Sequence, residues 1–166
     1  EVDVITAFTE IAQEALDWEA AHGERAEMII GTSMVEADIH KLLSWPHANI
    51  CTDGGLRDLH PRGAGSYPRI LGRYVREQNL MSLETAVHKS TGLAAKHMGI
   101  TDRGLIKEGM KADLVLFNHS TIIDHATPLD PQRISEGVDS VWVNGELVFK
   151  DGASTGAHPG QVIRRN

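Results

Sequence analysis

The sequence predicts an α/β protein, in which helices alternate with short apolar strands before a small antiparallel β unit. Helical periodicity and brief apolar runs follow one another up to about residue 100, an order typical of a parallel sheet with crossover helices. Beyond that point the dipeptide Asn144-Gly145 joins two apolar runs, a strong hairpin signal. The 166 residues include 41% apolar residues and 16 glycines, which favours a loop-rich α/β chain over a helical bundle.

The first elements alternate as this fold class requires. Apolar residues recur at helical spacing over residues 3–21, and Gly23 is the predicted stop of that helix. Residues 26–30 predict a short strand, and residues 35–45 predict a second helix with one apolar face. The apolar run 48–51 then predicts a buried strand.

A long polar loop and two more helices complete the first part of the chain. The loop is expected over residues 53–67, and the first of the two helices over 68–78. Ser82 predicts the cap of the next helix, which should end near His97 with Gly99 as its left-handed stop.

The pattern then becomes antiparallel. Residues 113–117 predict a strand, residues 141–149 a hairpin, and residues 160–165 a last strand. We therefore expect two domains, one over 1–100 built of βα units and a small β-sandwich-type domain over 101–166.

Composition excludes several classes of protein. The formal net charge is −7 and no basic stripe is present, which argues against a nucleic-acid partner. The single cysteine, Cys51, excludes an internal disulfide framework. No apolar run is long enough to cross a membrane, and no signal pattern begins the chain, so we expect a cytoplasmic protein without a membrane partner.

The length poses a problem for a closed α/β fold. A (β/α)8 barrel takes about 250 residues, and this sequence supplies only two apolar runs that resemble barrel strands. A two-stranded parallel piece leaves its faces and edges uncovered. The chain therefore closes differently, associates with itself, or is the C-terminal part of a longer enzyme; its start at Glu1, without methionine, favours the last interpretation.

The segment around Asp53 carries the clearest chemical signal. Asp53 follows the predicted strand 48–51 and precedes Gly54 and a polar loop that contains Arg62. A carboxylate just past the end of a strand is a candidate for metal or proton chemistry in parallel α/β folds. Taken alone, an aspartate before glycine is more often a turn residue.

Longer motifs around Asp53 resemble those of a known family and favour a chemical role for this residue over a turn role. The His60-Pro61-Arg62 triplet and the run Tyr67-Pro68-Arg69-Ile70-Leu71-Gly72-Arg73-Tyr74-Val75-Arg76 are the narrow signals, and the pattern over 104–115 is widespread among amidohydrolases. With these motifs the chain resembles the C-terminal portion of the N-acyl-D-amino-acid deacylases (D-aminoacylases), a branch of the metal-dependent amidohydrolase superfamily.

The resemblance implies a fold and a chemistry. Residues 1–100 would be the last βα units of a TIM barrel, followed by the small β domain. The full-length parent would hold zinc at the barrel mouth and hydrolyse a small-molecule N-acyl-D-amino acid. Asp53 would move a proton between zinc-bound water and the leaving amine, and Arg62 would bind the substrate carboxylate.

The metal site departs from the family pattern. The family uses an early His-x-His pair, a cysteine and two later histidines, whereas the nine histidines here form no such pair and Cys51 lies two residues before Asp53. Only Asp53 is left as a metal residue, weakly or indirectly bound, and catalytic zinc usually takes three protein ligands. We therefore expect no catalytic zinc in this chain alone, and inactivity without its missing N-terminal barrel half.

Two other interpretations stay open. One is a different amidohydrolase, such as a dihydroorotase- or hydantoinase-like cyclic amidase, against which the His60-Pro61-Arg62 triplet counts. The other is a non-catalytic chain, either truncated or acting as an interaction module, which the missing ligands favour.

Overall fold

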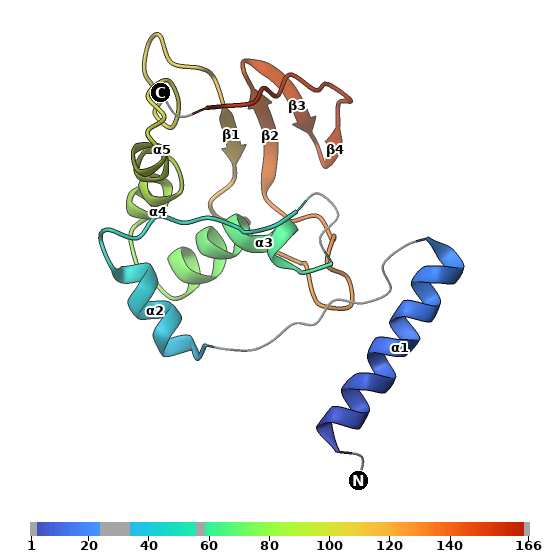
Figure 1. Cartoon of the computed structure of the whole chain (residues 1–166). Coiled ribbons are helices and arrows are strands. Elements are labelled where there is room, and N and C mark those ends of the chain that lie inside the picture. The colour runs from blue at the N-terminus through green and yellow to red at the C-terminus, as the bar shows by residue number, and fades with distance from the viewer. Residues whose placement is uncertain (1–2, 24–33, 56–58, 165–166) are drawn as a thin grey trace. The chain divides into compact units, whose positions relative to one another are not determined.

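The computed structural model describes residues 3–23, 34–55 and 59–164, which form two units. The described residues of the first unit, Glu1–Thr32, form the helix α1 (Val4–His22) (Figure 1). Asp3 begins α1 because its carboxylate accepts hydrogen bonds from the backbone N–H groups of Ile5 and Thr6, and Gly23 ends it with φ 73°. The predicted helix 3–21 is confirmed, and the predicted strand 26–30 lies outside the described residues.

The second unit, Ser33–Asn166, begins with α2 (Glu36–Ser44), as expected over 35–45. The predicted strand 48–51 is wrong: this segment is extended but forms no ladder with a strand of the described residues. Instead, the Ile50 backbone N–H donates to the Lys89 carbonyl at 3.1 Å. A parallel strand needs neighbours, and the apolar pattern that predicts a strand cannot show whether those neighbours exist.

Lys89 holds this extended segment to the end of α2. Its side chain is buried, and the amine donates to the carbonyl oxygens of Leu43 at 2.7 Å and Trp45 at 2.5 Å. Burial lowers the pKa of this amine. The two carbonyls satisfy the buried amine, and that of Leu43 is among those that a helix C-terminus leaves without a partner in the helix.

The next helix begins earlier than expected. α3 (Arg62–Arg69) starts inside the predicted loop 53–67 and continues directly into a π-helix, η1 (Ile70–Glu77), where a regular helix over 68–78 was expected. Pro68 has no N–H to donate to the Ala64 carbonyl one turn earlier. Ser135 fills that place, donating through Oγ to the Ala64 oxygen at 3.1 Å.

The helix predicted from Ser82 to about His97 is divided in two. α4 (Leu83–Ser90) and α5 (Gly92–Met98) meet at Thr91, whose φ of −129° and ψ of −88° interrupt the helix. Ser82 caps α4 through a hydrogen bond from the Thr85 N–H, and Gly99 ends α5 with φ 71°, as predicted.

A small core joins these helices. Its buried members are Ile50, Ile70, Tyr74, Val75 and Ala86. The core therefore fixes the segment before Asp53 against η1 and α4.

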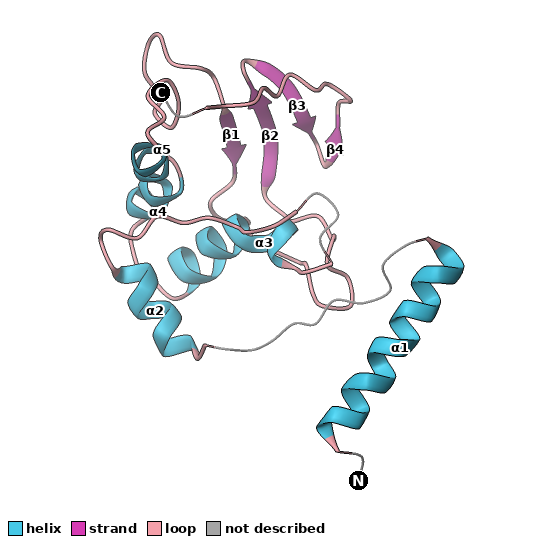
Figure 2. Ribbon diagram, viewed as in Figure 1, coloured by secondary structure: helices cyan, strands magenta, loops and turns pink. Residues whose placement is uncertain are grey.

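A four-stranded antiparallel sheet completes the second unit (Figure 2). Its strands are β1 (Leu114–Phe117), β2 (Val138–Val143), β3 (Glu146–Lys150) and β4 (Ala153–Ser154), in that order. The predicted hairpin is confirmed: Asn144 and Gly145 adopt φ values of 50° and 83°, as its turn requires. The last strand expected over 160–165 is absent from residues 160–164, and β4 lies earlier, after a tight turn.

α3 and η1 fit closely against the segment that leads from β1 to β2. A Cβ at Gly72 would lie 2.4 Å from the Ile122 carbonyl oxygen, so only glycine allows this approach. Arg69 donates two hydrogen bonds to the largely buried Asp124 carboxylate, and Arg76 donates to the Ile122 carbonyl. These contacts fix the helix that carries Arg62. In the described part of the chain, no helix is both long and apolar enough to cross a membrane.

Candidate functional site

Asp53 follows the segment 48–51 and has an unusual backbone conformation. Its φ is 50°, a left-handed conformation that aspartate adopts more readily than most residues. The next residue, Gly54, packs on the start of α3: a Cβ there would lie 2.5 Å from the Gly63 Cα atom. The side chain of Asp53 is 82% exposed, so a molecule approaching from solvent can reach it.

Arg62 is the first residue of α3 and faces Asp53. The distance from Arg62 Nη1 to Asp53 Oδ2 is 3.0 Å, and the arginine side chain is 39% exposed. The structure therefore brings the two predicted site residues together. An exposed ion pair of this kind contributes at most about 1 kcal/mol to stability, so it adds little to the stability of the fold. Both side chains remain accessible to solvent.

The elements around the pair differ from the expectation. Asp53 follows an extended segment without a ladder, and Arg62 belongs to a helix where a loop was expected. His60 orients the helix start, because the Arg62 backbone N–H donates to His60 Nδ1 at 3.0 Å. That hydrogen bond gives His60 a structural role.

Sequence analysis overlooked Thr52, which ties the two parts of the site together. Its hydroxyl donates to the Arg62 carbonyl oxygen at 2.6 Å, and the Ser66 hydroxyl donates to the same oxygen at 2.8 Å. The position of this hydroxyl directly before a candidate acid–base residue was the one signal in the sequence that pointed to Thr52. Its hydrogen-bond partner, the Arg62 carbonyl ten residues later, could be identified only from the folded structure.

The residues present do not fit a zinc site. Among the described residues, no group of three or more histidine, cysteine, aspartate or glutamate side chains could hold a metal ion. Asp53 is instead paired with a cation, Arg62, at 3.0 Å. A single carboxylate falls short of the three protein ligands of a catalytic zinc, and no reaction step through zinc follows from this chain.

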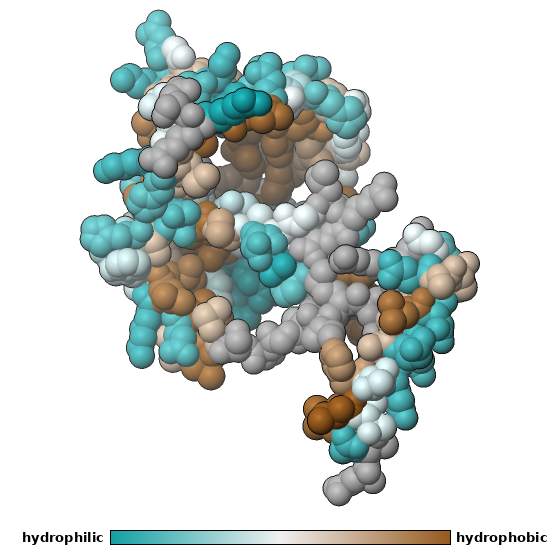
Figure 3. All heavy atoms as spheres, viewed as in Figure 1, coloured by the Kyte–Doolittle hydropathy of each residue, from teal (hydrophilic) through white to brown (hydrophobic). Residues whose placement is uncertain are grey.

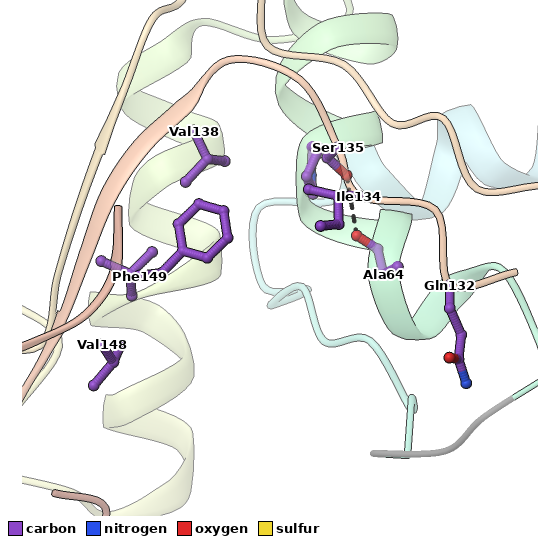
Figure 4. Close-up of a pocket in the computed structure, with 9 residues that line it drawn as sticks. Ala64, Gln132, Ile134, Ser135, Val138, Val148 and Phe149 are labelled. Atoms are coloured by element: carbon purple, nitrogen blue, oxygen red, sulfur yellow. Dashed lines mark hydrogen bonds between the residues drawn. The ribbon is translucent and has the colours of Figure 1, made fainter. Parts of the chain in front are cut away.

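A separate apolar pocket of about 330 Å³ lies between α3 and the sheet (Figure 4). Ala64 and Pro68 line it from α3, and Val138 and Phe149 from the sheet. Figure 3 shows apolar surface gathered in the hollow below the strands. None of the described residues that line the pocket has a charged side chain, so they supply no carboxylate or imidazole for acid–base or metal chemistry.

Comparison with known proteins agrees with the resemblance seen in the motifs. The amidohydrolase family model matches residues 11–149. The chain is 45% identical over 161 residues to N-acyl-D-aspartate deacylase of Alcaligenes xylosoxydans xylosoxydans, covering 94% of this chain and 32% of that enzyme.

Two solved structures are similar to most of the chain. One is a D-aminoacylase with a binuclear metal centre (TM-score 0.76, 42% identity, 80% of this chain and 28% of that one). The other is N-acyl-D-glutamate deacylase from Bordetella bronchiseptica, complexed with zinc and a phosphonate inhibitor (TM-score 0.72, 41% identity, 79% and 28%). The chain thus spans about a third of the length of the relatives it matches.

Proposed function

The chain belongs to the amidohydrolase family, and we propose on this basis that it is the C-terminal part of a zinc-dependent N-acyl-D-amino-acid deacylase. The parent enzyme would hydrolyse an N-acyl-D-amino acid to a carboxylate and a free D-amino acid. The observation that carries the proposal is the Asp53–Arg62 pair at 3.0 Å, because it combines a proton acceptor with a group that binds carboxylates.

Asp53 is proposed as the acid–base residue. Hydrolysis requires a proton to leave the attacking water and a proton to reach the departing amine, and one carboxylate can do both in turn. The 82% exposed side chain leaves room for water and for an amide beside it. Within the described residues, the interaction that the Asp53 side chain makes is its ion pair with Arg62.

Arg62 is proposed to bind the α-carboxylate of the substrate. A guanidinium presents two parallel N–H groups that match the two oxygens of a carboxylate. The contact with Asp53 shows which way the guanidinium faces, and a substrate held there would place its amide close to Asp53.

Zinc would require ligands from outside this chain, since Asp53 is the only metal residue that the resemblance transfers to it. We propose that the other two-thirds of the enzyme supplies them, with residues 1–100 as the last units of the barrel and 101–166 as the small β domain. Two features support a missing partner segment: the apolar pocket below the sheet, and β1, whose outer edge pairs with no strand of the described residues.

A substrate panel on the full-length enzyme tests the proposal. We expect hydrolysis of N-acetyl-D-methionine or N-acetyl-D-aspartate, with little hydrolysis of the L-enantiomers. Turnover of dihydroorotate or a hydantoin without any deacylation would instead indicate a cyclic amidase. Inactivity of a zinc-loaded full-length enzyme on every compound would favour a non-catalytic role.

A further inference from the structure

Two hydroxyl groups converge on one backbone oxygen next to the site. Thr52 Oγ1 lies 2.6 Å and Ser66 Oγ 2.8 Å from the Arg62 carbonyl oxygen, and the two hydroxyl oxygens are 3.2 Å apart. Both hydroxyls are half-buried. The Ser66 bond is local, reaching back four residues along α3, whereas the Thr52 bond joins residues ten apart in the chain.

The Thr52 bond joins the segment that carries Asp53 to the backbone of Arg62, beside the direct ion pair of the two side chains. Thr52 precedes Asp53 in the chain, and its partner is the backbone of Arg62 itself. On the other side of Asp53, Gly54 lies so close to α3 that a Cβ there would be 2.5 Å from the Gly63 Cα atom. Both neighbours of Asp53 are therefore held against the first turn of the helix that carries Arg62.

We infer that Thr52 is a positioning residue that sets the separation of Asp53 and Arg62, with Ser66 supporting it at the same oxygen. The inference deepens the proposed function and rests on it. The Thr52 hydroxyl would act through the Arg62 backbone, to which it donates, and not by binding substrate itself. It fixes where the substrate carboxylate is held relative to the acid–base group, and small errors of placement cost large factors in rate.

The residue has a sharp test because threonine and valine have nearly the same shape. Thr52→Val removes the hydroxyl, and Thr52→Ser keeps it. The matched control is Thr91→Val, since Thr91 Oγ1 donates to the Val87 carbonyl at 2.7 Å in an exposed turn that is distant in sequence from the site. Each variant is made in the full-length enzyme, with zinc content and melting temperature measured alongside.

The readout is the preference for a carboxylate. The ratio of kcat/KM for N-acetyl-D-methionine to that for N-acetyl-D-methioninamide reports how well Arg62 is placed. We expect Thr52→Val to raise KM for the acid and reduce this ratio, each by about tenfold, the effect of losing one hydrogen bond. Thr52→Ser should restore both values, and Thr91→Val should leave them unchanged.

The possible results distinguish a failure of the positioning role of Thr52 from a failure of the proposed deacylase function. A folded, zinc-loaded Thr52→Val enzyme with the wild-type ratio overturns the inference and leaves the deacylase function standing. If Thr52→Val does not fold, Ser66→Ala decides in its place: a reduced ratio supports the inference, and an unchanged ratio overturns it. A wild-type enzyme that hydrolyses no N-acyl-D-amino acid overturns both.

Discussion

Asp53 and Arg62 combine accessibility with a fixed geometry. The aspartate is 82% exposed and held at φ 50°, and the arginine is anchored at the first position of α3. Exposed charges can be replaced at small cost to the fold. Substitutions here should therefore report on chemistry with little effect on stability.

Asp53→Asn should leave the fold intact and lower the turnover of the full-length enzyme by about 10²–10⁴-fold, the loss typical of a general acid–base group. Asparagine tolerates the same left-handed backbone, so the free energy of unfolding should change by less than about 0.5 kcal/mol. Asp151→Asn is the matched control, because Asp151 is also exposed and has φ 50°. Near-normal turnover in Asp53→Asn would remove the catalytic assignment.

Arg62→Lys should mainly raise KM, by about tenfold or more, while kcat changes less, because lysine keeps the charge but loses the bidentate geometry. Steady-state kinetics with N-acetyl-D-methionine measure this. Arg73→Lys serves as the control, since Arg73 lies on the same helical run and pairs with Glu36 across an exposed surface. An unchanged KM in Arg62→Lys would contradict the role in substrate binding.

At the scale of elements, sequence prediction succeeded where the signal is local. Asn144-Gly145 demands a hairpin, and Ser82 and Gly99 mark helix ends, whatever surrounds them. The strand expected over 48–51 was wrong because a ladder depends on neighbours elsewhere in the chain. The early start of α3 had a local signal, since proline is frequent at helix starts and Pro61 immediately precedes Arg62.

The pairing of Asp53 with Arg62 lies between these cases. The sequence motif identified both residues as site candidates. Their separation of nine positions along a predicted polar loop does not determine whether the two side chains are in contact. The contact depends on Thr52 and on the close approach of Gly54 to Gly63. Neither feature leaves a pattern that periodicity analysis can detect.

The β2–β3 hairpin is held by Asp113, which precedes β1. Asp113 accepts hydrogen bonds from the Asn144 backbone N–H at 2.8 Å and from the guanidinium of Arg103, a side chain only 10% exposed. Burial raises the pKa of Asp113, but these two donors outweigh burial and keep the pKa below the usual value near 3.9. The carboxylate is therefore stabilised in the folded state.

Asp113→Asn should destabilise the second unit by about 1–2 kcal/mol at pH 7, a modest value because Asp113 remains 35% exposed. A lowered folded-state pKa gives stability that is present above about pH 3.9 and lost as pH falls through the folded value. The difference in unfolding free energy between wild type and Asp113→Asn should therefore shrink below pH 4. Urea denaturation at several pH values measures it, and a difference that persists at low pH would contradict this account.

At the scale of the whole molecule, each of the two units, taken by itself, exposes apolar side chains. On α1, Val4, Ile5 and Phe8 are 84%, 79% and 55% exposed, and on β1 Val115 and Leu116 are 56% and 54% exposed. Surfaces and strand edges of this kind normally contact another chain or segment. The pattern fits a part of a larger assembly.

The isolated 166-residue chain should therefore associate with itself at micromolar concentrations. Sedimentation equilibrium tests this expectation. Val115→Lys, which places a charge on the β1 edge, should weaken the association. A clean monomer at every accessible concentration would count against it.

In the proposed function, this chain supplies the acid–base and carboxylate-binding residues of a deacylase, and the rest of the enzyme supplies the metal site. The most direct test measures release of D-methionine from N-acetyl-D-methionine with zinc present, comparing the isolated chain with the full-length enzyme. We expect hydrolysis by the full-length enzyme and none by the chain alone. Comparable hydrolysis by the isolated chain, abolished by Asp53→Asn, would contradict it.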